Sequence, residues 1–171
     1  TAIHVQQDGS VLAADNKRIY QYQNNKWTLV QTGLNIPYSA QFRNGLDGST
    51  WLPAANKLIV FNNDKITIFN SVGKFLTDVL IDKKGQVWTL DLETGDVASF
   101  NYNKQTLQPL KKFAGLTYSK ERRELTYQAG QLLETDAGAI WVVNSLSDVP
   151  PMSYEPSINA WREHQLPSNV N

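Results

Sequence analysis

Groups that could perform acid–base or metal chemistry are few in this chain and far apart. Its two histidines, His4 and His164, have no second ligand at a metal-binding spacing. Imidazole is the common proton-transfer group near neutral pH and a frequent metal ligand. A histidine without a second ligand or acid–base partner nearby is a weak candidate for either role. The chain has no cysteine, which excludes disulfides, thiolate metal sites and a cysteine nucleophile. We therefore expect both histidines to be structural or exposed.

Two pairs of carboxylates could serve acid–base catalysis. Asp91 and Glu93, and likewise Glu134 and Asp136, are two residues apart and would share one face of a strand. Glycoside hydrolysis needs two carboxyl groups roughly 5–10 Å apart across a cleft. Both pairs follow apolar runs, which favours turn and strand-end roles. No serine elbow, phosphate loop, dinucleotide fingerprint, calcium loop or zinc motif is present. We predict no catalytic residue, no metal site and no cofactor.

Tyrosine and arginine side chains in the loops are the best candidates for ligand contact. These two residue types combine a large contact area with directed hydrogen bonds and are enriched in binding hot spots. Both are also ordinary surface residues. The candidate ligand-binding residues are Tyr38, Tyr118, Arg122, Arg123 and Tyr127.

Composition and charge exclude several classes of protein. Of the 171 residues, 41% are hydrophobic, which is typical of a globular protein. Basic and acidic residues number 16 each, and this balance argues against a nucleic-acid partner. No apolar run approaches the roughly 20 residues that span a bilayer, so we expect no transmembrane segment. Residues 1–7 lack the features of a signal peptide. The absence of cysteine weakly favours a periplasmic or extracellular location.

The elements that must position these groups belong to a repeat of roughly 40 residues. Each copy contains a glycine followed, at the third position, by leucine or tryptophan. These pairs are Gly9 and Leu12, Gly48 and Trp51, Gly85 and Trp88, and Gly138 and Trp141. Apolar residues alternate in short bursts separated by Asn, Asp, Gly and Lys, which predicts strands and turns. Asp-Gly between two such runs is a strong hairpin signal.

Four strands in each repeat, connected as a meander, are typical of a β-propeller blade. We predict an all-β propeller of about four four-stranded antiparallel blades that forms part of a larger propeller. The whole chain, 1–171, would be one propeller segment. The approximate blades are residues 1–31, 40–70, 75–111 and 124–166, and the second begins with a strand over residues 40–46.

The leucine and tryptophan positions of the repeat would lie on the second strand and pack between blades. A tryptophan buries roughly 150–250 Å² and suits such a core; the alternative is that these rings form platforms for sugars. The longest interval between glycines holds an insertion at residues 111–126. Insertions in repeat arrays lie in loops on one face, which is often the binding face.

The repeat resembles the two-component regulator propeller repeat of periplasmic sensor domains in hybrid histidine kinases and diguanylate cyclases. Residues 82–89 (DKKGQVWT) and 136–143 (DAGAIWVV) match its glycine and tryptophan pattern, and residues 166–169 (LPSN) are similar to its blade link. The Gly-Thr that follows the tryptophan in that family is missing from every repeat. Residues 154–161 also resemble a kelch repeat, and residues 25–27 a tectonin repeat.

This resemblance implies a binding module of a bacterial extracytoplasmic signal-sensing protein, not an enzyme. The ligand would be a small molecule, a glycan or a protein, held on the face of the inter-blade links. Further propeller blades or a homodimer partner would complete the assembly. Two other hypotheses stay open: a lectin-like or scaffolding propeller, and a propeller lyase or glycan-cleaving enzyme. A structure with His4 far from any carboxylate would count against the enzyme.

Overall fold

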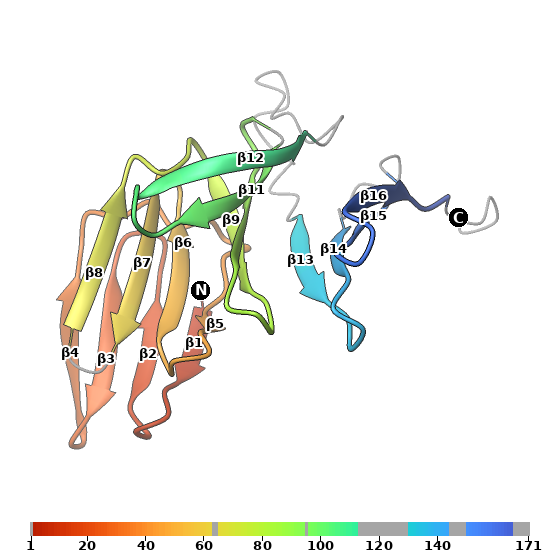
Figure 1. The fold of residues 1–171 in the computed structure, drawn as a ribbon. Helices are drawn as coiled ribbons and strands as arrows, with labels where there is room; N and C mark the ends of the chain where they lie inside the picture. The colour runs from red at the N-terminus through yellow and green to blue at the C-terminus, as the bar shows by residue number, and fades with distance from the viewer. Residues whose placement is uncertain (1, 63–64, 95, 113–129, 144–149, 166–171) are drawn as a thin grey trace, which may run out of the picture.

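The described part of the chain is built from antiparallel β-strands. The structure, a computed structural model, describes residues 2–62, 65–94, 96–112, 130–143 and 150–165. Its strands form four sheets of four strands, and the sheets follow one another in chain order (Figure 1). Within each sheet, neighbours in sequence are neighbours in space. The predicted four-bladed organisation is therefore confirmed, and each sheet is called a blade below.

The strand bounds are as follows. Blade 1 comprises β1 (Ala2–Val5), β2 (Val11–Ala14), β3 (Ile19–Gln23) and β4 (Lys26–Gln31). Blade 2 comprises β5 (Arg43–Asn44), β6 (Thr50–Ala54), β7 (Lys57–Asn62) and β8 (Lys65–Asn70). Blade 3 comprises β9 (Leu76–Ile81), β10 (Val87–Asp91), β11 (Asp96–Asn101) and β12 (Thr106–Lys112). Blade 4 comprises β13 (Gln131–Glu134), β14 (Ile140–Val143), β15 (Met152–Glu155) and β16 (Ala160–Glu163).

The repeated glycine is explained by the first turn of each blade. All four glycines of the repeat have φ between +80° and +84°, a conformation that costs glycine little because it has no Cβ. An aspartate before the glycine fixes this turn in three blades. The Asp82 carboxylate, for example, accepts hydrogen bonds from the backbone N–H groups of Lys84 (2.9 Å) and Gln86 (2.8 Å). The sequence motif is thus a turn motif.

The hydrophobic core lies between the blades. Three clusters of buried side chains join blade 1 to blade 2, blade 2 to blade 3 and blade 3 to blade 4. Leu12, Trp51 and Trp88 each belong to the cluster shared with the following blade and are at most 5% exposed. They are inter-blade core, as predicted. Trp141 is only partly buried, since the described residues place no blade beyond blade 4.

The first strand of blade 2 is shorter than predicted. A strand over residues 40–46 was expected, but β5 contains two residues. The side chains of Ala40 and Phe42 are buried in the cluster between blades 1 and 2. The N–H of Ala40 donates to the carbonyl of Pro37, so this backbone forms a turn. The apolar residues here fill the core without joining the sheet.

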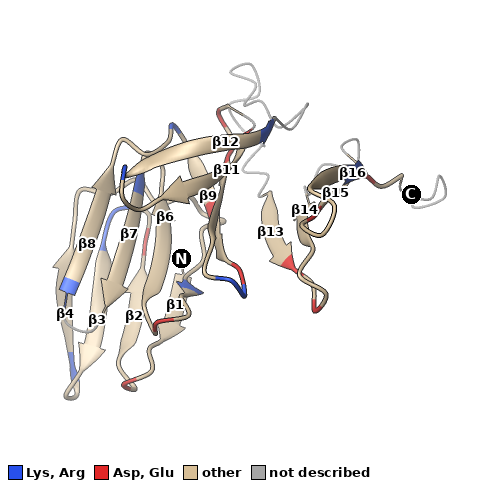
Figure 2. Cartoon of the chain, in the orientation of Figure 1, with Lys and Arg blue, Asp and Glu red and all other residues tan. Residues whose placement is uncertain are grey.

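Charged residues of both signs are interspersed along the chain, without a basic stripe on the described strands (Figure 2). In the residues that the structure describes, no helix is long and apolar enough to cross a membrane.

Candidate functional site

The link between blades 1 and 2 holds Tyr38 at the surface on a well-anchored segment. Two residues of this link, Leu34 and Ile36, are buried against blade 1. Their backbone N–H groups donate to the carbonyls of Lys17 (3.1 Å) and Asn16 (2.9 Å). The turn at Pro37 follows directly, and Tyr38 is 62% exposed. Because the flanking residues are fixed, the backbone that carries the Tyr38 ring has a defined position.

Tyr38 lines a pocket of about 360 Å³. The other lining residues are Ala2, Ile3, Ser39, Ala40, Gln41, Phe42 and Gln131. They come from the first strand of blade 1, the link into blade 2 and the first strand of blade 4. Residues of the first and fourth blades can line one pocket only near the axis around which the blades are arranged. The pocket therefore marks the axial opening, at the end where the first strands begin.

The lining of this axial pocket is polar but uncharged. Its hydrogen-bonding groups are the Tyr38 phenol, the Ser39 hydroxyl and the amides of Gln41 and Gln131, beside apolar Ile3. Amides and hydroxyls both donate and accept hydrogen bonds. Such a lining suits a neutral ligand with several hydroxyl or amide groups and gives an ion no counter-charge.

Of the five predicted ligand-binding residues, the structure locates one. Tyr38 lies in the axial pocket. Tyr118, Arg122, Arg123 and Tyr127 lie outside the described residues. Sequence reasoning missed Gln41 and Gln131, because glutamine carries no motif. Gln131 begins β13 in the structure, and the inner strand predicted over residues 128–134 was the one available signal.

A second depression of about 680 Å³ lies between blades 3 and 4, among their strand-connecting turns. It is charged, with Lys83, Lys84, Glu134 and Glu155 in its lining. Several of its polar groups already hold the two blades together: the Lys83 N–H donates to the Glu134 carboxylate (3.0 Å), and the Lys83 amine donates to the carbonyl of Asp136 (3.1 Å). Part of the polar lining of this depression is therefore engaged in contacts between the two blades.

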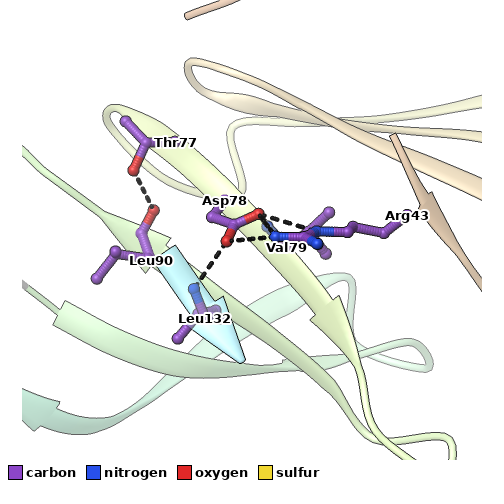
Figure 3. A network of polar contacts seen from close by, with 6 residues as sticks. All are labelled: Arg43, Thr77, Asp78, Val79, Leu90 and Leu132. Carbon is purple, nitrogen blue, oxygen red and sulfur yellow. Dashed lines mark hydrogen bonds and ion pairs between the residues drawn. The ribbon is translucent and has the colours of Figure 1, made fainter. Parts of the chain in front are cut away.

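A buried carboxylate joins three blades near the axis. Asp78 on β9 forms an ion pair with Arg43 on β5, with Nη2 and Oδ2 3.1 Å apart (Figure 3). It also accepts hydrogen bonds from the backbone N–H groups of Leu132 on β13 (2.8 Å) and Val79 (2.9 Å). The Asp78 side chain is 4% exposed. One side chain thus connects the first strands of blades 2, 3 and 4.

Burial raises the pKa of Asp78 above 3.8, against the opposing influence of Arg43 and the two N–H donors. At a pH between 3.8 and the raised pKa, the Asp78 carboxyl is protonated in the folded state but ionised in the unfolded chain. The free energy of unfolding contributed by Asp78 should therefore fall as the pH rises through that interval.

Urea unfolding of the wild type and Asp78→Asn at several pH values measures this effect, because the variant keeps every other titrating group. We expect the stability advantage of the wild type to be larger at the acidic end of the interval. An advantage that grows steadily towards neutral pH would show that ion pairing outweighs burial.

The other titratable candidates have structural roles. His4 packs against Phe42, with ring centroids 5.9 Å apart, and its Nε2 is buried without a hydrogen-bond partner. His164 Nε2 lies 2.8 Å from Ser153 Oγ. Asp91 accepts the backbone N–H groups of Lys74 (2.7 Å) and Glu93 (2.9 Å). Within the described ranges, neither histidine contacts a carboxylate and no group of three potential ligands could hold a metal ion.

Comparison with known proteins identifies the fold. Neither a family model nor a curated protein matches the sequence. Solved structures do match. Virginiamycin B lyase from Staphylococcus aureus superposes with a TM-score of 0.70 at 14% identity, over 98% of this chain and 55% of the lyase. The extracellular domain of a hybrid two-component system from Bacteroides thetaiotaomicron gives 0.67 at 17% identity, over 99% and 24%. Both are propellers. The chain is a partial β-propeller.

A second extracellular domain of a hybrid two-component system from the same organism superposes with a TM-score of 0.59 at 11% identity, over 95% of this chain and 22% of that domain. The chain thus spans about half of the lyase and about a quarter of the two sensor domains. The neighbours include an enzyme and extracellular domains of signalling proteins, so the propeller fold is compatible with either activity.

Proposed function

We propose that this partial propeller is a ligand-binding module of a bacterial extracytoplasmic signal-sensing protein. It captures a neutral small molecule, a glycan in the first instance, at the axial pocket. The observation that carries this proposal is the uncharged pocket around Tyr38, formed by residues of blade 1, blade 4 and the link. The similarity to extracellular domains of two-component systems supports an extracytoplasmic location.

Two alternatives have less support. A lectin that used the repeated tryptophans as sugar platforms would need exposed rings, but Trp51 and Trp88 are at most 5% exposed. A propeller enzyme is favoured by the similarity to virginiamycin B lyase. Such an enzyme would need an acid–base group in the axial pocket, but no carboxylate or histidine is among the residues that line it. His4 faces Phe42 and has no polar partner for Nε2, and the Asp78 carboxylate is buried in its ion pair with Arg43.

Replacing Tyr38 by alanine should weaken binding of a neutral oligosaccharide by at least about tenfold, because its ring is the largest exposed side chain that lines the pocket. The probes are maltohexaose, cellohexaose and mannohexaose, measured by isothermal titration calorimetry. Gln131→Ala should weaken binding of the same sugar, whereas Gln108→Ala, on exposed β12, should not change it.

Tyr38→Phe separates the ring from the hydroxyl, and wild-type affinity in that variant would assign the contact to stacking. The proposal fails if none of the three hexasaccharides binds the wild type. It also fails if a sugar binds equally well to the wild type, Tyr38→Ala and Gln131→Ala, since the site would then lie elsewhere.

A further inference from the structure

Two neighbouring interfaces between blades differ in how completely aromatic rings fill them. Between blades 2 and 3, ring contacts link four side chains: Trp51, Phe69, Phe100 and Tyr102. Tyr102 is the outermost and is 50% exposed, with its ring centroid 5.4 Å from that of Trp51 and 5.4 Å from that of Phe69. Its ring contacts the other three rings, each of which is at most 5% exposed, and thereby covers them.

The turn that carries Tyr102 recurs in blade 4 with proline in place of the tyrosine. Both turns join the third strand of a blade to the fourth. In both, the residue directly before the fourth strand has a positive φ: Gln105 (53°) in blade 3 and Asn159 (49°) in blade 4. Tyr102 and Pro156 each lie three residues before that position. Pro156 is therefore the counterpart of Tyr102 in a turn of the same form, but it has no aromatic ring.

The other three positions keep two aromatic rings and lose one. Repeat position and strand register give the counterparts of Trp51, Phe100 and Phe69, in that order, as Trp88, Tyr154 and Leu110. The ring centroids of Trp88 and Tyr154 lie 5.4 Å apart. Leu110 lies at the bulge where the pairing of β12 with β11 shifts, and it is 41% exposed, whereas Phe69 is 5% exposed.

The depression of about 680 Å³ between blades 3 and 4 is the space that these two replacements leave open. All four counterparts line it: Trp88, Leu110, Tyr154 and Pro156. In the groove between blades 2 and 3, the Tyr102 ring fills the equivalent place. Aromatic rings whose centroids lie 4.5–7 Å apart in tilted or edge-to-face arrangements attract each other beyond the burial of their area. The depression is thus shaped and lined for one more aromatic ring.

The rim of the depression carries polar groups that the fold does not use. Four lining residues make no side-chain hydrogen bond or ion pair with other described residues: Lys84, Ser99, Glu155 and Ser157. Lys84 and Glu155 have opposite charges, so the rim does not select an ion of one sign. Ammonium, hydroxyl and carboxylate groups can pair with the C=O and N–H groups of a peptide backbone. The rim therefore suits the backbone on either side of an inserted aromatic side chain.

We propose that this depression binds an aromatic side chain of a partner polypeptide, in the place that Tyr102 holds between blades 2 and 3. Because Tyr102 is itself a phenol on a polypeptide backbone, tyrosine is the expected residue. The depression and the axial pocket lie at opposite ends of β13: Gln131, its first residue, lines the axial pocket, and Glu134, its last, lines the depression. Failure of either proposal therefore leaves the other standing.

Nuclear magnetic resonance of the ¹⁵N-labelled chain tests the site, because each groove contains an indole N–H. The Trp88 Nε1–H donates to Asp82 and lines the depression, whereas the Trp51 Nε1–H donates to Ser49 in the filled groove. The probe is the acetylated and amidated pentapeptide GNYNG. We expect it to shift the Trp88 indole signal saturably and to leave the Trp51 signal in place. The peptide GNANG, without the tyrosine, should bind at least about tenfold more weakly.

Two variants exchange the properties of the two grooves. Pro156→Tyr should fill the depression from within and weaken binding of GNYNG by at least about tenfold. Pro156→Ala is the matched control, since it also removes the proline but leaves the depression open, and it should keep the wild-type affinity. Tyr102→Ala should open the groove between blades 2 and 3, so that GNYNG also shifts the Trp51 signal. The remaining signals in each spectrum check that the variants are folded.

Three results would overturn the proposal. The first is a Trp88 signal that stays in place throughout a titration with GNYNG into the millimolar range, or that GNANG shifts as strongly. The second is full affinity in Pro156→Tyr, because the ring would then bind elsewhere. The third is binding of free 4-methylphenol as tight as that of GNYNG, because the ligand would then be a small aromatic molecule and not a polypeptide.

Discussion

Asp78→Ala is expected to lower the free energy of unfolding by about 3–5 kcal/mol. The substitution removes the partner of the largely buried Arg43 guanidinium and leaves the Leu132 N–H without its acceptor. An uncompensated buried charge costs more than the ion pair contributed, so the loss exceeds that of an ordinary surface ion pair. Urea unfolding followed by tryptophan fluorescence measures the change.

A double-mutant cycle with Arg43 separates the two causes. If the unpaired Arg43 guanidinium accounts for most of the loss, the double variant should lose less free energy of unfolding than the sum of the losses in Arg43→Ala and Asp78→Ala. The control is the exposed ion pair between Arg18 and Asp15. Arg18→Ala should change stability by less than about 1 kcal/mol. A similarly small effect of Asp78→Ala would contradict a central structural role.

Trp88→Ala should lower the free energy of unfolding by about 3–5 kcal/mol, because it empties a large volume in the cluster between blades 3 and 4. The indole is 5% exposed and lies 5.4 Å from the Tyr154 ring, centroid to centroid. Its Nε1–H donates to the Asp82 carboxylate at 2.9 Å, so the residue also secures the turn. Denaturant unfolding reports the loss.

Trp88→Phe is the matched variant, since it keeps an aromatic ring and removes the donor to Asp82. We expect it to cost less than half as much as Trp88→Ala. Affinity for the hexasaccharides should be the same in the folded fraction of all three proteins. A Trp88→Ala protein of unchanged stability that had lost sugar binding would show that the ring is a binding platform and not core.

The fold was predictable because its signals are local and repeated. Glycine with positive φ after an aspartate marks the first turn of three blades, and the alternating apolar runs mark the strands. The shortened β5 escaped prediction because Ala40 and Phe42 are apolar residues that a strand could also bury. Their packing against blade 1 is a tertiary contact, and alternation alone does not distinguish it from pairing within a sheet.

The candidate site was less accessible from sequence. Tyr38 was predicted because tyrosine in an inter-blade link combines contact area with a hydrogen-bonding group; it lines the axial pocket, and its contact with a ligand stays a prediction. Gln131 lines the same pocket but belongs to blade 4, far along the chain from Tyr38. No local sequence pattern predicts that these two residues lie together. Asp78 was missed for a related reason: its partners, Arg43 and Leu132, are 35 and 54 residues away. Side chains brought together by ring geometry leave no spacing rule in the sequence.

The placement of the core between blades has a consequence for how the molecule opens. No blade encloses a core of its own among the described residues, so a blade is ordered by its neighbours, as in a one-dimensional array with nearest-neighbour coupling. In an isolated arc, blades 2 and 3 have two neighbours and the end blades have one. Local unfolding then starts at the ends and travels inward, which makes the amide protons of β7 and β10 the slowest to exchange with solvent. Closing the ring would remove the ends and turn a fraying array into a single cooperative unit.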